Sequence, residues 1–137
     1  MFAEFEIPVN TQDGDIIAIR NGTGSANGIF VSYRSSSVVQ LIVRTGSTNA
    51  LIFQRIGSYP LGKNKIAVAY KNGDFAISLN GTAAQVNTSS ITMPTSLDSV
   101  ALFGDNLYAQ TLPVPYAPVL LFKTRLTNAK LADLTTI

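Results

Sequence analysis

Carboxylates are the residues best suited to acid–base chemistry here, because the 137-residue chain contains neither histidine nor cysteine. Two pairs are close in sequence, Glu4 with Glu6 and Asp13 with Asp15. Glycoside hydrolysis needs two carboxylates at a defined separation across a cleft. The first pair falls on the outward face of an edge-like strand, and the many serine and threonine hydroxyls have no histidine base. The sequence therefore predicts a protein that is not an enzyme and has no catalytic residues.

Calcium binding is the second chemistry to weigh. Asp105 with Asn106, or Asp13 with Asp15, would supply hard oxygen ligands. The same residues fit turns, because Asp-Gly and Gly-Asp-Asn both suit turn conformations. No complete ligand set can be named from the sequence. We favour the turns and expect neither a metal nor a cofactor.

Sugar or partner recognition is the third chemistry. A tyrosine ring offers an apolar face to a sugar and carries a polar edge. Exposed tyrosines are equally favoured at protein interfaces, and the chain has no tryptophan. Tyr33 and Tyr70 follow the inward alternation of their strands and are predicted to be core residues. The candidate partner- or glycan-binding residues lie in predicted loops: Tyr59, Asp105, Asn106, Tyr108, Gln110 and Tyr116.

Composition limits the classes of protein. The chain is 46% hydrophobic and only 13% charged, which is too apolar for disorder and predicts a single domain spanning residues 1–137. The net charge is +2 and the charges are scattered singly, so we expect no nucleic-acid partner. No stretch approaches the roughly 20 apolar residues of a membrane helix, and no charged leader precedes an apolar run. We expect no membrane insertion and no signal peptide.

The segment Lys63–Val86 has the strongest structural signal. Its apolar residues alternate on both sides of Asn72-Gly73, and Asn80-Gly81 follows. Asn-Gly favours tight primed turns, whose central residues need positive φ. We therefore expect a meander of antiparallel strands here.

Alternating apolar residues predict further strands near 3–9, 17–19, 29–34, 39–44, 50–56, 97–103 and 119–122. In the predicted strand 39–44, the outward positions include Gln40 and Arg44. The run 119–122 is predicted to be a buried strand. Three prolines between residues 113 and 118 predict an extended surface loop over 104–118. Thr127 or Asn128 can cap a short helix that places Leu131 and Leu134 on the body of the protein. Eight or nine short strands indicate an all-β, two-sheet antiparallel sandwich with one C-terminal helix.

Two segments carry a family resemblance. KIAVAYKNGDFAISLNG at 65–81 and RLTNAKLADLTT at 125–136 resemble the laminin-G or concanavalin A-like lectin domains of bacteriophage tail and other virion structural proteins. The resemblance implies a jelly-roll sandwich. It departs from the family before the last strand, where Tyr116-Ala-Pro-Val replaces a Gly- and Asn-rich segment. The loop from Asp105 to Pro118 is therefore expected to be the most individual surface of the protein.

Two functions remain open at this point. The first is a non-enzymatic virion protein, either a capsid decoration or a tail or fibre component, that docks on other virion subunits and forms a homo-oligomer. It would be located in virions assembled in the host cytoplasm, as the resemblance implies. The alternative is an adhesion module that recognises a host surface glycan through loop tyrosines and amides.

Overall fold

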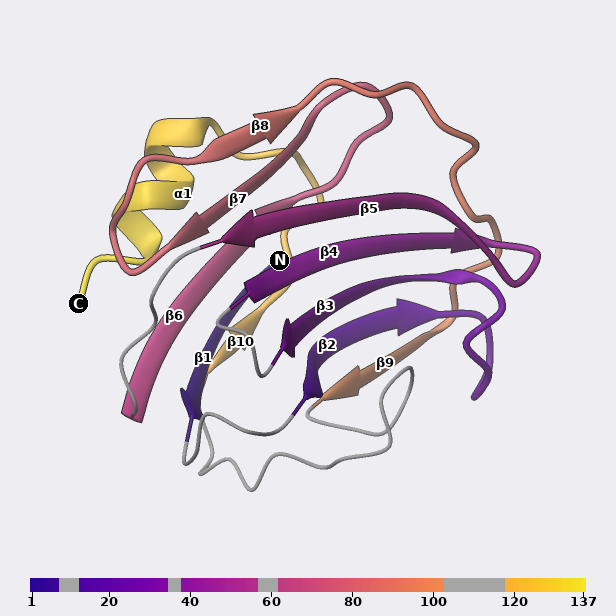
Figure 1. Cartoon of the computed structure of the whole chain (residues 1–137), viewed down its shortest axis with the longest axis horizontal. Coiled ribbons are helices and arrows are strands. Elements are labelled where there is room, and N and C mark those ends of the chain that lie inside the picture. Colours follow the sequence, from indigo (N-terminus) through magenta and orange to yellow (C-terminus); the bar gives the residue numbers. More distant parts are fainter. Residues whose placement is uncertain (8–12, 35–37, 57–61, 103–117) are drawn as a thin grey trace. The chain divides into compact units, whose positions relative to one another are not determined.

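The computed structural model describes residues 1–7, 13–34, 38–56, 62–102 and 118–137. These residues form ten strands and one helix, arranged in two five-stranded antiparallel sheets with orders β10-β1-β6-β7-β8 and β5-β4-β3-β2-β9 (Figure 1). The predicted all-β class, its two sheets and its single short helix are confirmed. The elements are β1 (Phe2–Ile7), β2 (Gly14–Arg20), β3 (Gly28–Arg34), β4 (Val38–Thr45), β5 (Thr48–Ile56), β6 (Gly62–Ala69), β7 (Phe75–Leu79), β8 (Gln85–Asn87), β9 (Ser99–Leu102), β10 (Val119–Leu120) and α1 (Asn128–Leu134).

The chain divides into two compact units, and each unit contains one of the sheets. The first unit comprises Met1–Pro8, Pro60–Ser90 and Val114–Ile137, and it holds the β10-β1-β6-β7-β8 sheet with α1. The second comprises Val9–Tyr59 and Ile91–Pro113, and it holds the β5-β4-β3-β2-β9 sheet. No helix in the described residues is long and apolar enough to span a bilayer.

In the first unit, the two Asn-Gly turns differ. Asn80 and Gly81 both have positive φ, 48° and 71°, so the turn between β7 and β8 is of the predicted primed kind. In the turn between β6 and β7 only Gly73 has positive φ, 73°, and Asp74 donates its amide to the Lys71 carbonyl. The prediction of a primed turn at Asn72-Gly73 is wrong, because only the glycine there leaves the ordinary region of φ.

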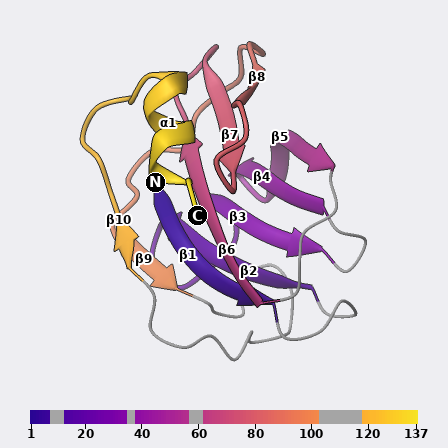
Figure 2. The same ribbon diagram turned by 90° about the vertical axis from the view of Figure 1, so that its left-hand side faces the viewer.

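Helix α1 packs on β6 and β7 (Figures 1 and 2). Leu131 is 2% exposed and packs against three alanines and a phenylalanine from the strands. Because an alanine methyl group extends little from the sheet, the helix backbone can approach β6 and β7 closely. Thr127 caps the helix, since its hydroxyl accepts the amide of Lys130, as predicted. The strand residues under the helix are Phe2, Ala67, Ala69 and Ala76.

In the second unit, one face of the sheet is almost entirely apolar. The predicted inward residues of β2, β3 and β4 lie on it in register: Val31 pairs with both Ile17 and Leu41, and all three are buried. Tyr33, at the end of β3, is 1% exposed and confirms its predicted core position. A register shift between Asp15 and Ile17 adds one residue to β2, so that Ile16 is buried as well.

Four expectations are corrected. Tyr70 is only half-buried, because β6 ends at Ala69. The 119–122 run forms the two-residue β10, and its leucines are 43–49% exposed, so it is not a buried strand. Strand β1 lies between β10 and β6 and is not an edge strand. Gln40, expected outside, is 4% exposed.

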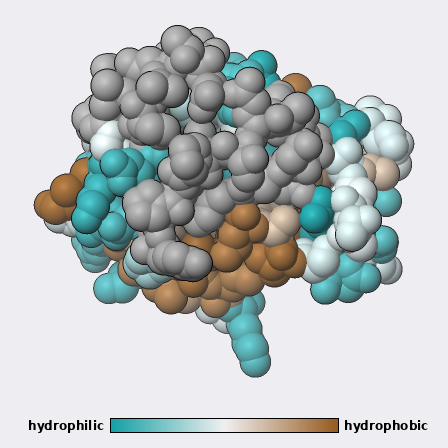
Figure 3. Space-filling model, turned by 90° about the horizontal axis from the view of Figure 1, so that it is seen from below, coloured by the Kyte–Doolittle hydropathy of each residue, from teal (hydrophilic) through white to brown (hydrophobic). Residues whose placement is uncertain are grey.

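Several large apolar side chains remain exposed, and apolar residues gather on part of the face drawn in Figure 3.

Candidate functional site

The six predicted contact residues lie outside the described residues, as does segment 105–117, which contains all of them except Tyr59. Tyr59, Asp105, Asn106, Tyr108, Gln110 and Tyr116 therefore stay predictions. The other predicted oxygen ligands are placed. Asp13 forms an ion pair with Arg34, at 3.2 Å, and Asp15 is buried and accepts the Ser32 hydroxyl at 2.7 Å. In the part of the chain that the structure describes, no three acidic residues gather as metal ligands would.

The second face of the β5-β4-β3-β2-β9 sheet holds most of the polar strand residues of the second unit. Residues that pair directly across neighbouring strands share a face, and alternate residues along one strand return to it. The register therefore sorts this face into three parallel rows. They are an arginine row (Ser99, Arg20, Gly28, Arg44 and Asn49), an apolar row (Ala101, Ala18, Phe30, Ile42 and Ile52) and an amide row (Asp15, Ser32, Gln40 and Gln54).

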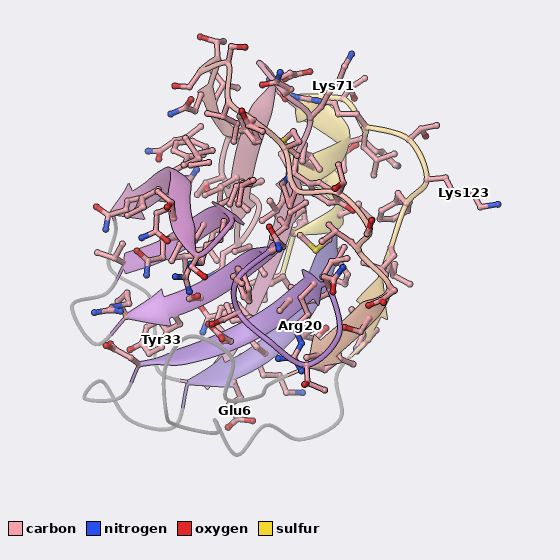
Figure 4. The ribbon with its side chains drawn as sticks, turned by 90° about the vertical axis from the view of Figure 1, so that its right-hand side faces the viewer. Glu6, Arg20, Tyr33, Lys71 and Lys123 are labelled. Carbon is pink, nitrogen blue, oxygen red and sulfur yellow. The ribbon has the colours of Figure 1, made fainter. Side chains whose placement is uncertain are left out.

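The arginine row contains two half-buried guanidinium groups. Arg20 Nη1 donates to the Thr23 carbonyl at 2.8 Å, and Arg44 Nη2 donates to the Ser47 carbonyl at 2.6 Å. Neither arginine forms an ion pair with a carboxylate of the described residues, and the Nε of each is buried without a hydrogen-bond partner. Arg44 Nη1 also donates to the Ser25 hydroxyl, at 3.3 Å, so what remains unsatisfied in each side chain is the buried Nε–H donor. Figure 4 shows Arg20 at the opposite end of the sheet from Tyr33.

Gly28 separates the two arginines within the row. A Cβ at this position would lie 2.7 Å from two ring atoms of Phe30 and 3.0 Å from the Ile19 carbonyl oxygen. The ring of Phe30 thus occupies the space over Gly28, and Phe30 is itself fully buried with Ala18 and Ile42. Glycine is needed because the aromatic ring approaches the backbone closely. The Phe30 ring therefore lies over the position that separates the two arginines in the row.

Loops at the arginine end of this sheet are tied to one another. Segment 21–27 joins β2 to β3, the turn at 46–47 joins β4 to β5, and 91–98 precedes β9. Asp98 holds the 21–27 loop by accepting the Gly22 amide at 2.7 Å. It directly precedes Ser99 and is therefore the acidic residue closest in sequence to the arginine row. A polar surface held in place this way loses less conformational entropy when it binds a ligand. Further links are Asn21 Nδ2 to the Ser96 carbonyl, the Gly46 amide to Asn27 Oδ1, the Ser47 amide to the Ala26 carbonyl, and the Thr45 hydroxyl to the Thr92 carbonyl, at 2.8–3.0 Å.

Exposure decides which parts of the three rows a ligand can reach. Asp15 and Ser32 are buried, whereas Gln54, at the β5 end of the amide row, is exposed and donates to Gln40 at 3.3 Å. Ile52 in the apolar row is 51% exposed, and Asn49 is also exposed. The most exposed part of this face therefore lies along β5 and combines amides with one branched apolar side chain, while Arg20 and Arg44 are partly exposed.

Sequence reasoning did not find the arginine row. Arg20 and Arg44 lie 24 positions apart and read as isolated charges. The available signal is that each follows an apolar alternation at an outward position, near the end of its strand. Their common row depends on the register of β2, β3 and β4, which includes a shift in β2.

The Tyr33 hydroxyl is also buried and has no hydrogen-bond partner among the described residues. Burial raises the pKa of this phenol, and the nearby charge of Asp13 raises it further. The ring belongs to the apolar face, however, because Tyr33 and its cross-strand partner Val39 lie on the same face of the sheet as Val31 and Leu41. It is therefore not part of the three-row face.

Solved structures show which fold this is. The chain resembles the CBM40 module of a Ruminococcus gnavus IT-sialidase bound to α2,3-sialyllactose, with a TM-score of 0.74 and 16% identity over 99% of this chain and 80% of that one. The same module bound to α2,6-sialyllactose gives a TM-score of 0.65 and 15% identity, over 98% and 80%. A leech intramolecular trans-sialidase gives a TM-score of 0.71 and 14% identity, over 99% of this chain and 23% of that one.

The likeness covers nearly the whole chain and confirms the predicted jelly-roll fold of the concanavalin A-like type. No protein-family model and no curated protein sequence matches the chain. At 14–16% identity the similarity concerns the fold alone.

Proposed function

We propose that this protein is a non-catalytic glycan-binding module and that its arginine row reads an acidic group of the glycan. Two of the similar structures are carbohydrate-binding modules that hold sialyllactose, an acidic sugar. That similarity favours the adhesion-module alternative over the virion role. The virion location and the capsid or tail partners gain no support from the comparisons and stay predictions.

The observation that carries the proposal is the pair of uncompensated guanidinium groups of Arg20 and Arg44. A buried N–H without an acceptor costs about 1–3 kcal/mol, and each arginine has one at Nε. A carboxylate satisfies such a donor through charge-assisted hydrogen bonds, for which the planar guanidinium is well shaped. Partial burial strengthens the attraction, because the effective dielectric constant is lower than in water.

The accessible residues along β5 suit the remainder of a sugar. Ile52 offers an apolar surface to the C–H face of a pyranose ring, and the amides of Asn49 and Gln54 can donate to and accept from hydroxyl groups. Most of this face is held by backbone pairing and by the tied loops, so the ligand would meet a preformed surface. A host surface glycan with a terminal acidic sugar is the ligand class that fits these groups.

The proposal is tested by calorimetric titration of the intact chain with 3′-sialyllactose and with lactose, which lacks the acidic sugar. We expect sialyllactose to bind and lactose to bind at least about tenfold more weakly. A tenfold difference corresponds to the loss of about one hydrogen bond to a charged group. Arg20→Met and Arg44→Met should each weaken sialyllactose binding by about tenfold or more. Lys63→Met, which removes one exposed charge from β6, is the matched control and should leave binding unchanged.

Arg44 also anchors the loop at Ser47, so Arg44→Lys is added as a variant that keeps the charge. Urea unfolding of each variant separates lost folding from lost binding. Equal affinity for lactose and sialyllactose would overturn the acidic-glycan assignment. Arginine variants that fold and bind as well as Lys63→Met would overturn the assignment of the site.

A further inference from the structure

The first unit contains a pocket of about 90 Å³ that the glycan proposal does not use. It is lined by the end of β6, by the segment between β10 and α1, and by the helix. This volume is the share of about three water molecules in the liquid. It therefore has room for a group of a few non-hydrogen atoms. The lining residues used below are Val68, Tyr70, Phe122, Lys123, Arg125 and Leu131.

The floor of the pocket is apolar and its walls are aromatic. Val68 and Leu131 are buried, Tyr70 is half-buried, and Phe122 remains 37% exposed. Exposure of an aromatic ring beside a pocket leaves apolar area that a ligand can cover. Burial of apolar area stabilises a complex by roughly 25 cal/mol per Å². The apolar part of a ligand would be bound in this way.

Charge in the pocket has one sign. None of the described residues that line it is acidic, Lys123 is cationic, and the guanidinium of Arg125 is ion-paired with Asp74, which lies outside the lining. Figure 4 shows the Lys123 side chain extending away from the ribbon, so its ammonium group lies at the rim and in solvent. A cation there attracts an anion without fixing its position. The pocket therefore selects against cationic ligands.

Arg125 supplies the fixed donor. Its Nη2 donates to Asp74 Oδ1 and to Asn128 Oδ1, both at 2.7 Å, and its Nη1 donates to the Leu126 carbonyl. These contacts hold the guanidinium in one orientation, while its Nε is buried and has no hydrogen-bond partner. Buried donors in native proteins are normally satisfied, if not by protein then by a bound molecule. An acceptor oxygen bound in the pocket would satisfy the unpartnered Nε–H donor of Arg125.

We propose that this pocket is a second ligand site, which takes a small organic carboxylate with a short apolar chain. The carboxylate accepts from Arg125 Nε near the Lys123 rim, and the chain packs against Phe122, Tyr70 and the apolar floor. This inference stands independently of the glycan proposal, because all the residues involved belong to the first unit.

The test follows side-chain methyl signals of Val68, Leu126 and Leu131 by NMR while sodium butyrate is added to the intact chain. We expect saturable shifts with a Kd of about 1–10 mM, as suits a ligand of a few heavy atoms. Butylamine at the same concentrations should produce no saturable shift, and 1-butanol should bind at least about threefold more weakly than butyrate. A linear, unsaturated response to butyrate would overturn the proposal.

Two matched pairs of variants locate the site. Phe122→Ala should weaken butyrate binding at least about threefold, whereas Leu121→Ala, at the exposed neighbour outside the pocket, should change it less than about 1.5-fold. Lys123→Ala should weaken binding, and Lys130→Ala on the exposed side of α1 should not. All four positions are exposed, so the variants should fold. Equal effects within either pair would contradict the assignment.

Discussion

Removing one buried hydroxyl should loosen the contact between α1 and the turn after β7. Thr135 is fully buried at the C-terminal end of the helix. Its Oγ1 accepts the Gly81 amide at 3.0 Å and lies 3.1 Å from the Ser78 hydroxyl. Ser78 donates its hydroxyl hydrogen to the Thr82 carbonyl at 2.7 Å, and the Thr135 hydroxyl also lies within donor distance of the Ala132 carbonyl, at 3.0 Å, and of the Leu131 carbonyl, at 3.2 Å. Thr135→Val keeps the shape of the side chain and removes all of these hydroxyl contacts.

The magnitude follows from what is left unpaired. A stranded buried N–H costs about 1–3 kcal/mol, and a lost neutral hydrogen bond costs about 1 kcal/mol. Gly81 itself is exposed, so water can partly replace the lost acceptor and the lower half of the range applies. We expect Thr135→Val to lower the free energy of unfolding by about 1.5–3 kcal/mol.

Urea unfolding monitored by circular dichroism measures this difference, and Thr136→Val is the matched control. The Thr136 hydroxyl makes only an exposed contact, at 3.3 Å, with the Ala132 carbonyl. Its replacement should change the free energy of unfolding by less than about 0.5 kcal/mol. A Thr135→Val protein within 0.5 kcal/mol of the wild type, or an equal loss in both variants, would refute the reasoning.

Two further predictions concern Gly28 and the N-terminal amine. Gly28→Ala should lower the free energy of unfolding by about 1–3 kcal/mol, because its methyl group would lie 2.7 Å from the buried Phe30 ring. Gly24→Ala is the matched control, since a Cβ there has nothing within 4 Å, and it should cost less than about 0.5 kcal/mol in the same urea assay. Burial lowers the pKa of the Met1 amine from 8.0 to about 6, so the unfolded chain binds this proton more tightly. Stability should therefore rise by about 2 kcal/mol between pH 6 and 8. No histidine titrates in that window, and a chain acetylated at Met1 should lose this rise; the same rise after acetylation would contradict the assignment.

Much of the fold follows from local patterns. The inward row containing Val31 and Leu41, the cap at Thr127 and the primed turn at Asn80-Gly81 were all predictable, because each depends on residues close in sequence. The position at which α1 packs on the sheet could not be predicted in this way. Ala69 and Ala76 alternate with larger residues, and a small side chain looks the same in sequence whether solvent or a helix covers it.

The candidate site was less predictable than the fold. Sequence reasoning searched the loops for aromatic residues, whereas the three-row face is made of strand residues brought together by register. Arg20 and Arg44 share a row only because both pair with Gly28. Local composition contains no information about pairing between residues 24 positions apart, so the two charges read as unrelated.

Nitrogen-15 NMR of the intact chain during titration with 3′-sialyllactose tests the central claim most directly. The side-chain Nε–H signals of Arg20 and Arg44 report on the two unused donors. We predict that both signals shift and saturate together with the backbone amides of Gly28 and Asn49, while lactose leaves the two Nε–H signals in place. Saturable binding that leaves both Nε–H signals unmoved, or no binding at all, would contradict the account.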